Sequence, residues 1–294
     1  MQLLFLVLLI AAVFSFFAPI VQRRLQAKLS NTPALVWTFP FLLTLVFALA
    51  AGLVQALSLQ LILIVFVYTL LPVGCAVRTD RVSTGAKPPF TDFVTILLIW
   101  LPLEFAVGGS LVPRAAQGFL HSVGYGIAIL LGLALFIGFR RFPGMKYNLP
   151  RSGSDWRLPL MAFAILAPIL IVVSVAIGFI PLPHLPVQPA GKMTAAVGII
   201  FAGTAIPEEI LFRALIQNWL MQRFGRTWQV LLVASVIFGS AHLDNGPQAV
   251  PNWRYAIAAT IAGYAYGRVF DRSSTVVSSA ILHTLVDWTK HFFF

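Results

Sequence analysis

The chain of 294 residues is 59% hydrophobic and only 10% charged, against about 25% charged residues in ordinary soluble domains. This excludes a soluble globular protein, because one core would have to hide several apolar runs of about 20 residues, the length that spans a bilayer as a helix. The formal net charge of +11 requires no nucleic-acid partner, because Lys and Arg in cytoplasmic loops face anionic lipid head groups.

Ten apolar segments, separated by charged or Pro/Gly-rich connectors, predict an all-α, polytopic transmembrane bundle of about ten helices. In chain order they cover residues 3–20, 34–57, 59–77, 93–112, 119–139, 158–180, 193–220, 228–243, 255–269 and 273–288. No basic region precedes the first segment, and Arg23 and Arg24 follow it. We therefore expect an outward-facing anchor that stays in the mature protein rather than a cleaved signal peptide.

The basic residues predict the orientation, because Lys and Arg gather in cytoplasmic loops. With the N-terminus outside, the inner side receives Arg23, Arg24, Lys28, Arg78, Arg81, Lys87, Arg140, Arg141, Lys146, Arg151, Arg157, Arg223, Arg226, Arg268 and Arg272. The outer side receives Arg114, Lys192, Arg254 and Lys290, and Arg213 lies within a helix. We therefore expect the connection 140–157 to be cytoplasmic and PLPHLPVQPAGK, residues 181–192, to lie on the opposite side.

A few ionisable residues fall inside the apolar segments, where charge is costly and usually marks a cavity or a functional site. They are Glu104, Glu208, Glu209, Arg213, His242, His283 and Asp287. Glu209 and Arg213 are four residues apart, so they share a helix face and can form an ion pair. Glu208 is rotated by about 100° from Glu209, which leaves it free for a different, reactive role.

The next two segments repeat this four-residue spacing. Phe238 and His242 share a face, and the small residues Gly239, Ser240 and Ala241 between them allow another helix to approach closely. His283 and Asp287 share a face of the last segment. Three helices therefore present Glu, His, and His plus Asp.

Other polar or small residues predict structural roles. Glu104 has no motif around it, so a structural partner or a cavity-lining group is favoured over catalysis. Gly263-x-x-x-Gly267 is typical of close helix packing. The WTKHFFF end, residues 288–294, is typical of an interfacial aromatic anchor.

Taken together, Glu208-Glu209-x-x-x-Arg213, Phe238-x-x-x-His242 and His283-x-x-x-Asp287 resemble the three-motif signature of the CAAX protease and bacteriocin-processing (CPBP) family, related to the Ras-converting prenyl-protein protease. The resemblance covers roughly the last hundred residues. It implies an intramembrane endopeptidase core over residues 91–294, preceded by additional transmembrane helices over residues 1–90. It also implies a multi-pass protein, which we expect in a bacterial-type inner (plasma) membrane.

The resemblance also implies a mechanism in which Glu208 is the general base and His242 helps to orient and deprotonate water, without a covalent intermediate or a cofactor. Glu209 and Arg213 would hold the helix and the local charge, and His283 with Asp287 would stabilise the oxyanion. The best-known pattern has asparagine in place of Asp287, and an ionised aspartate can only accept hydrogen bonds. Asp287 therefore has three open roles: it orients His283, is protonated, or helps to hold a metal.

We expect a hydrophobic or lipid-anchored peptide or protein as substrate, membrane lipids as partners and no nucleic acid. One alternative is a zinc-dependent membrane protease, because Glu208, His242, His283 and Asp287 are acceptable zinc ligands, although HExxH is absent. The other is a non-enzymatic membrane scaffold, immunity protein or transporter. A scaffold would tolerate loss of Glu208, whereas a transporter predicts inverted repeats, which the sequence does not show.

Overall fold

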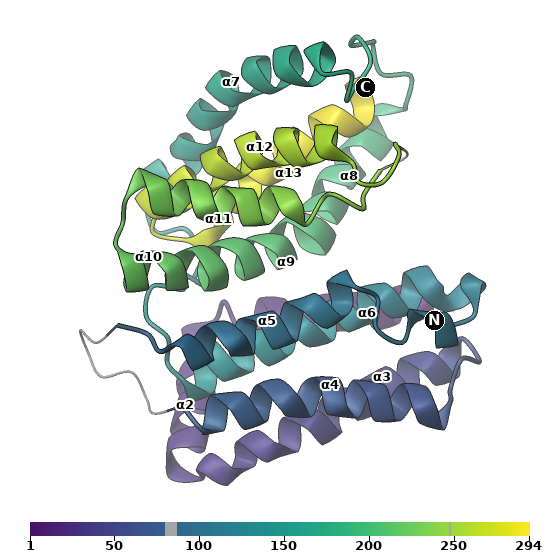
Figure 1. Cartoon of the computed structure of the whole chain (residues 1–294), viewed down its shortest axis with the longest axis vertical. Helices are drawn as coiled ribbons and strands as arrows, with labels where there is room; N and C mark the ends of the chain where they lie inside the picture. Colours follow the sequence, from purple (N-terminus) through teal and green to yellow (C-terminus); the bar gives the residue numbers. More distant parts are fainter. Residues whose placement is uncertain (80–86, 247) are drawn as a thin grey trace. The chain divides into compact units, whose positions relative to one another are not determined.

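The computed structural model describes residues 1–79, 87–246 and 248–294, and this part of the chain is all-α, as predicted (Figure 1). Arg81, predicted on the inner side, lies outside the described residues. The chain divides into two compact units, Met1–Gly144 and Met145–Phe294. The boundary between these units, at Gly144 and Met145, divides the chain by its contacts and not by its function. It therefore does not test the predicted start of the catalytic core at residue 91, which stays a prediction.

The first unit begins with a sharp bend. Its helices are α1 (Gln2–Ser15), α2 (Pro19–Asn31), η1 (Pro33–Trp37), α3 (Thr38–Leu53), α4 (Leu59–Val77), α5 (Phe90–Glu104), η2 (Gly109–Leu111), α6 (Arg114–Leu133) and the π-helical η3 (Ala134–Phe139). α1 and α2 meet at 79°. Pro19 disfavours the helical conformation at the preceding residue, and Ala18 is extended at φ −75° and ψ 119°. The first predicted segment is therefore broken before its end.

Hydrogen bonds inside the first unit involve the buried Asp92 and Arg140 and the partly buried Glu104. Arg140 Nε donates to Asp92 Oδ1 over 2.8 Å, with both side chains fully buried, and Arg140 Nη1 donates to the Thr79 carbonyl over 2.6 Å. Glu104 Oε2 accepts a 2.8 Å hydrogen bond from Trp100 Nε1. Glu104 therefore has a structural partner on its own helix, one turn away.

The second unit contains one long helical run and four further helices. The run Ala190–Phe224 comprises α8 (Ala190–Ile200), η4 (Phe201–Ala205), α9 (Ile206–Glu209), η5 (Ile210–Gln217) and α10 (Asn218–Phe224). The others are α7 (Gly153–Ala176), α11 (Trp228–Ser240), α12 (Trp253–Arg272) and α13 (Val276–Phe293). Gly225, at φ 99°, ends the long run because this backbone region favours glycine.

Small residues bring α11 and α12 together. A Cβ on Gly239 would lie 2.6 Å from the Ala256 carbonyl, and one on Gly263 would lie 2.8 Å from the Phe238 ring. The predicted close packing at both glycines is confirmed, and it brings Phe238 of α11 against α12.

A carboxylate connects α7 with the start of α13. Asp155, near the start of α7, accepts hydrogen bonds from the backbone N–H and the hydroxyl of Ser274, just before α13.

Among the residues that the structure describes, six helical stretches are long and apolar enough to cross a membrane: Pro33–Leu53, Leu59–Val77, Phe90–Leu111, Arg114–Phe139, Gly153–Ala176 and Ala190–Phe224. The bent pair of α1 and α2 makes a seventh if it is one span. The multi-pass, all-α class is confirmed, but fewer than ten helices satisfy this criterion. α11 does not satisfy it because it has only 13 residues. α12 and α13 do not satisfy it because they carry polar side chains, and these helices can carry them because they are packed against other helices.

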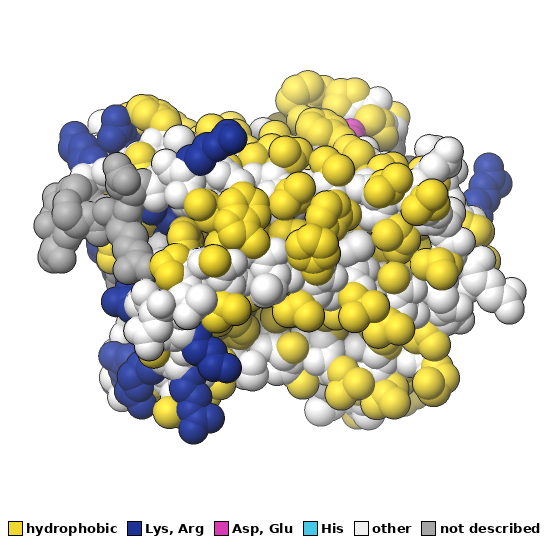
Figure 2. Space-filling view, turned by 90° about the horizontal axis from the view of Figure 1, so that it is seen from below, with side chains coloured by type: hydrophobic (Ala, Val, Ile, Leu, Met, Phe, Trp, Pro, Cys, Tyr) yellow, Lys and Arg dark blue, Asp and Glu magenta, His cyan; other side chains and the backbone are white. Residues whose placement is uncertain are grey.

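The face shown in Figure 2 has hydrophobic side chains across most of its area, while Lys and Arg side chains gather toward one end. This separation is the one expected when apolar side chains face lipid and basic residues face cytoplasm. The direction of the chain across the membrane stays a prediction.

Cysteine labelling tests this orientation. We expect a Gly153→Cys protein, in a Cys75→Ala background, to react with an impermeant thiol reagent only after the cells are permeabilised. Gly153 is exposed, and no atom lies within 4 Å of a Cβ built there, so the cysteine has room to react. Val187→Cys, at a side chain 88% exposed in the connection predicted outside, is the matched control and should react in intact cells. The reverse pattern would overturn the orientation.

Candidate active site

Glu209 links two separate helices through its two carboxylate oxygens. Oε2 accepts a 3.1 Å hydrogen bond from Arg213 Nε, with both side chains fully buried. Oε1 lies 3.1 Å from His283 Nδ1 of α13. An ionised carboxylate can only accept hydrogen bonds, so His283 Nδ1 carries a proton. The Arg213 guanidinium also lies 4.7 Å from the centre of the Phe238 ring, which supplies a cation–π contact.

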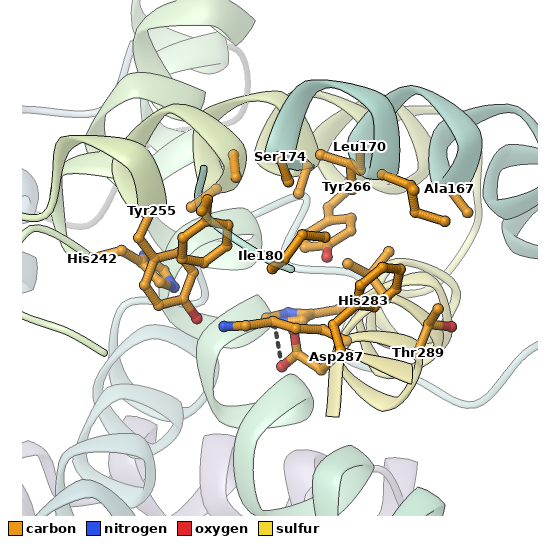
Figure 3. A pocket seen from close by; sticks show the side chains of 18 of the residues that line it. Ala167, Leu170, Ser174, Ile180, His242, Tyr255, Tyr266, His283, Asp287 and Thr289 are labelled. Atoms are coloured by element: carbon orange, nitrogen blue, oxygen red, sulfur yellow. Dashed lines mark ion pairs between the residues drawn. The ribbon is translucent and has the colours of Figure 1, made fainter. Parts of the chain in front are cut away.

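The other ring nitrogen of His283 faces two more carboxylates. Nε2 lies 3.4 Å from Asp287 Oδ2, the ion pair marked in Figure 3, and 3.8 Å from Glu208 Oε2. The Tyr266 ring stacks on the imidazole at 4.7 Å and 21°. Three carboxylates and an aromatic face therefore hold the His283 ring in one orientation.

Glu208 differs from Glu209 in both exposure and partners. Its side chain is 24% exposed, whereas that of Glu209 is fully buried. Within the described part of the chain, Glu208 Oε2 has no hydrogen-bond partner. The two glutamates lie between the π-helical stretches η4 and η5, and such stretches are frequent at functional sites. Oε2 is itself buried, so the exposed part of the Glu208 side chain lies elsewhere, and this oxygen keeps an unused capacity to accept a proton.

His242 lies just beyond the C-terminal end of α11, at Ser240, so its predicted position inside that helix is wrong. The helix ends early because the chain must turn toward α12. Nδ1 lies 2.9 Å from the Phe238 carbonyl, which can only accept, so Nδ1 donates and Nε2 keeps a free lone pair in the neutral ring. Phe238 and Tyr255 contact the imidazole edge-on, at 4.8 and 4.6 Å between ring centres.

His242, His283 and Asp287 line one cavity of about 70 Å³. In Figure 3, His242 and Tyr255 lie at one side of it, and His283 and Asp287 lie across from α7. A volume of this size holds several water molecules. Glu208 is not among the lining residues, but it lies next to His283 as described above. The structure therefore brings the four predicted catalytic residues together, three around the cavity and the fourth through His283.

The sequence interpretation did not include three polar residues that line this cavity: Tyr255, Tyr266 and Lys290. The two tyrosines carried no sequence signal beyond their place in an apolar segment. Lys290 was assigned to the outer side, although it is three residues from Asp287 and so shares its helix face.

No group of three or more His, Cys, Asp or Glu side chains within residues 1–79, 87–246 and 248–294 is arranged to hold a metal ion. Glu208, His242, His283 and Asp287 were the ligands considered for zinc. His242 points its proton-bearing nitrogen at a backbone carbonyl, and the Phe238 ring contacts both His242 and His283, at 4.8 and 5.8 Å between ring centres. The donor geometry as it stands does not fit the predicted four-ligand zinc site.

Residues 188–289, about a third of the chain, match the family model described as type II CAAX prenyl endopeptidase Rce1-like. No curated protein and no solved structure matches the chain. The matched segment contains all seven residues that carry the three motifs: Glu208, Glu209, Arg213, Phe238, His242, His283 and Asp287. The predicted resemblance to the CAAX proteases is confirmed over this segment, which ends one residue before Lys290.

Proposed function

We propose that the chain is an intramembrane endopeptidase that hydrolyses a peptide bond with activated water, because residues 188–289 match the Rce1-like family model of CAAX proteases. The observation that carries this proposal is two unused acceptors next to the same group of residues: His242 lines the cavity, and Glu208 lies 3.8 Å from His283, which lines it too. Glu208 Oε2 has no donor among the described residues, and His242 Nε2 is left free by the bond that Nδ1 makes. Two acceptors suit a water molecule, which has two protons to donate.

In the proposed reaction Glu208 takes a proton from water, while His242 Nε2 accepts the other water hydrogen and orients the oxygen. The oxygen forms a bond to the peptide carbonyl carbon, and the carbonyl electrons move onto its oxygen. When this intermediate collapses, the carbon–nitrogen bond breaks, and the leaving amine takes the proton held by Glu208. Atoms and charges balance without a covalent enzyme intermediate.

His283 has a supporting part in this scheme. Its Nδ1 proton is committed to Glu209, and its Nε2 faces Glu208 and Asp287. This supports the option in which Asp287 orients His283, since an ionised carboxylate cannot donate to an oxyanion. A proton on His283 Nε2 would be the donor that stabilises the negative charge developing nearby.

The proposed substrate is a hydrophobic or lipid-anchored peptide. One wall of the cavity comes from apolar residues of α7, among them Phe163, Leu170 and Ile171. Other α7 side chains, including Ile165 and Val172, are exposed, as expected of a helix that faces lipid. A segment dissolved in the bilayer can therefore approach the site past α7. The proposed location is a bacterial-type inner membrane.

Purified protein, incubated with hydrophobic membrane peptides and followed by mass spectrometry, tests this function. We expect a defined internal cut whose rate is unchanged by 1,10-phenanthroline, because the proposed chemistry needs only Glu208 and His242. Loss of cleavage with the chelator, restored by added zinc, would favour the zinc alternative. Absence of any cut across the peptide set would contradict the enzyme and favour a scaffold.

A further inference from the structure

Lys290 places a positive charge in the wall of the cavity that holds His242, His283 and Asp287. Its half-buried side chain extends from α13, one turn beyond Asp287. The ammonium lies 4.0 Å from the centre of the Tyr255 ring and 4.9 Å from that of Phe179, and these two rings stack at 4.7 Å. Cation–π contacts with both rings hold the ammonium at the cavity.

The Lys290 ammonium has no polar partner in the described part of the chain. No carboxylate of the described residues lies within ion-pair distance of it, so Asp287 acts on it only through its charge, although an ammonium has three hydrogens to donate. Lys146 in the same unit shows the opposite situation. Its ammonium donates to three backbone carbonyls, those of Phe270, Asp271 and Ser273, at 2.7 to 3.1 Å. Lys146 is a structural lysine, whereas Lys290 keeps its donors free.

We propose that Lys290 is a specificity-determining residue that binds a carboxylate of the peptide substrate. This rests on the proposed function, because the cavity must be the one that receives the peptide. A compact ammonium in a largely apolar cavity favours a single anionic group, and a peptide can offer a carboxylate at its C-terminus or on an Asp or Glu side chain. Lys290 lies beyond the segment that matches the family, so it adds a recognition element from this chain's own C-terminal residues.

The test compares three dansylated leucine–alanine peptides of equal length with the full-length protein in detergent. One has a free C-terminal carboxylate, one a C-terminal amide, and one an amide with a glutamate near its C-terminus. We expect the wild-type protein to favour the free acid over the plain amide by about tenfold in both Kd and kcat/KM, the lower range for a close charge pair. In Lys290→Met this ratio should fall to about one, and Lys290→Arg should restore part of it.

The third peptide identifies the source of the carboxylate. Binding as tight as that of the free acid indicates that a side chain suffices, whereas binding like the plain amide indicates the C-terminus. Lys192→Met is the matched control, because Lys192 is exposed and does not line the cavity, so the ratio should stay at its wild-type value.

Three results would overturn the proposal. If the wild-type protein favours neither the free acid nor the amide, or if Lys290→Met keeps the wild-type preference, Lys290 does not recognise the carboxylate. Either result leaves the proposed protease function unaffected. A uniform loss of binding for all three peptides in Lys290→Met would indicate a structural role instead. If the peptides bind with the expected ratio and none is cut, the proposed function fails while the carboxylate site stands.

Discussion

Glu208→Gln is expected to lower kcat/KM by about 10²–10⁴, the usual contribution of general acid–base catalysis, while the protein keeps its fold. The amide has nearly the shape of the carboxylate but cannot take the proton from water. Glu208 Oε2 accepts no hydrogen bond from the described residues, so the substitution removes no hydrogen bond and changes only the charge that lies 3.8 Å from His283 Nε2. Cleavage of the peptide found for the wild type, together with thermal unfolding in detergent, measures both effects.

The neighbouring glutamate provides the matched control for this result. Glu209→Gln changes the same atoms one residue away, but Glu209 is bonded to both Arg213 and His283, so this variant should unfold more readily than wild type. Cleavage at the normal rate by Glu208→Gln would remove Glu208 as the base. Unfolding of Glu208→Gln beside a stable Glu209→Gln would reverse the division of roles between the two residues.

Loss of the buried ion pair should have the largest effect on stability. Arg213→Ala removes the arginine partner of the buried Glu209 and leaves only His283 beside it, and loss of one partner of a buried ion pair typically costs about 3–5 kcal/mol. The cation–π contact of Arg213 with Phe238 is lost as well. Unfolding in mixed micelles with an increasing fraction of denaturing detergent measures this change in stability. The protein that remains folded should have lost activity, because Glu209 also holds His283 and its movement would displace that ring.

The second unit contains an exposed ion pair that serves as a comparison. Arg226 Nη1 and Asp271 Oδ1 are 3.0 Å apart, and the Arg226 side chain is 56% exposed. Arg226→Ala should therefore cost only about 0–1 kcal/mol. Equal losses of stability in Arg213→Ala and Arg226→Ala would show that the buried pair has no special structural part.

The local features of this protein could be predicted from the sequence alone. Nine of the ten apolar segments overlap one helix or helical run of the described residues, and the first is broken between α1 and α2, because hydrophobic runs and their Pro, Gly and charged boundaries act over a few residues. The ion pair of Glu209 and Arg213 followed from the same short range, since residues four apart meet on any helix face. The motif residues of the site were found for the same reason.

Features that depend on packing between distant segments could not be predicted in this way. The bond between Glu209 and His283 joins residues 74 positions apart, and it shows that His283 links two helices rather than only facing an oxyanion. Packing also decided that Lys290 extends into the cavity over Tyr255 and Phe179. The composition of the WTKHFFF end, residues 288–294, predicted only an anchor at the membrane surface. Helix spacing determines which side chains share a face, but only the packing of helices against one another determines what that face meets.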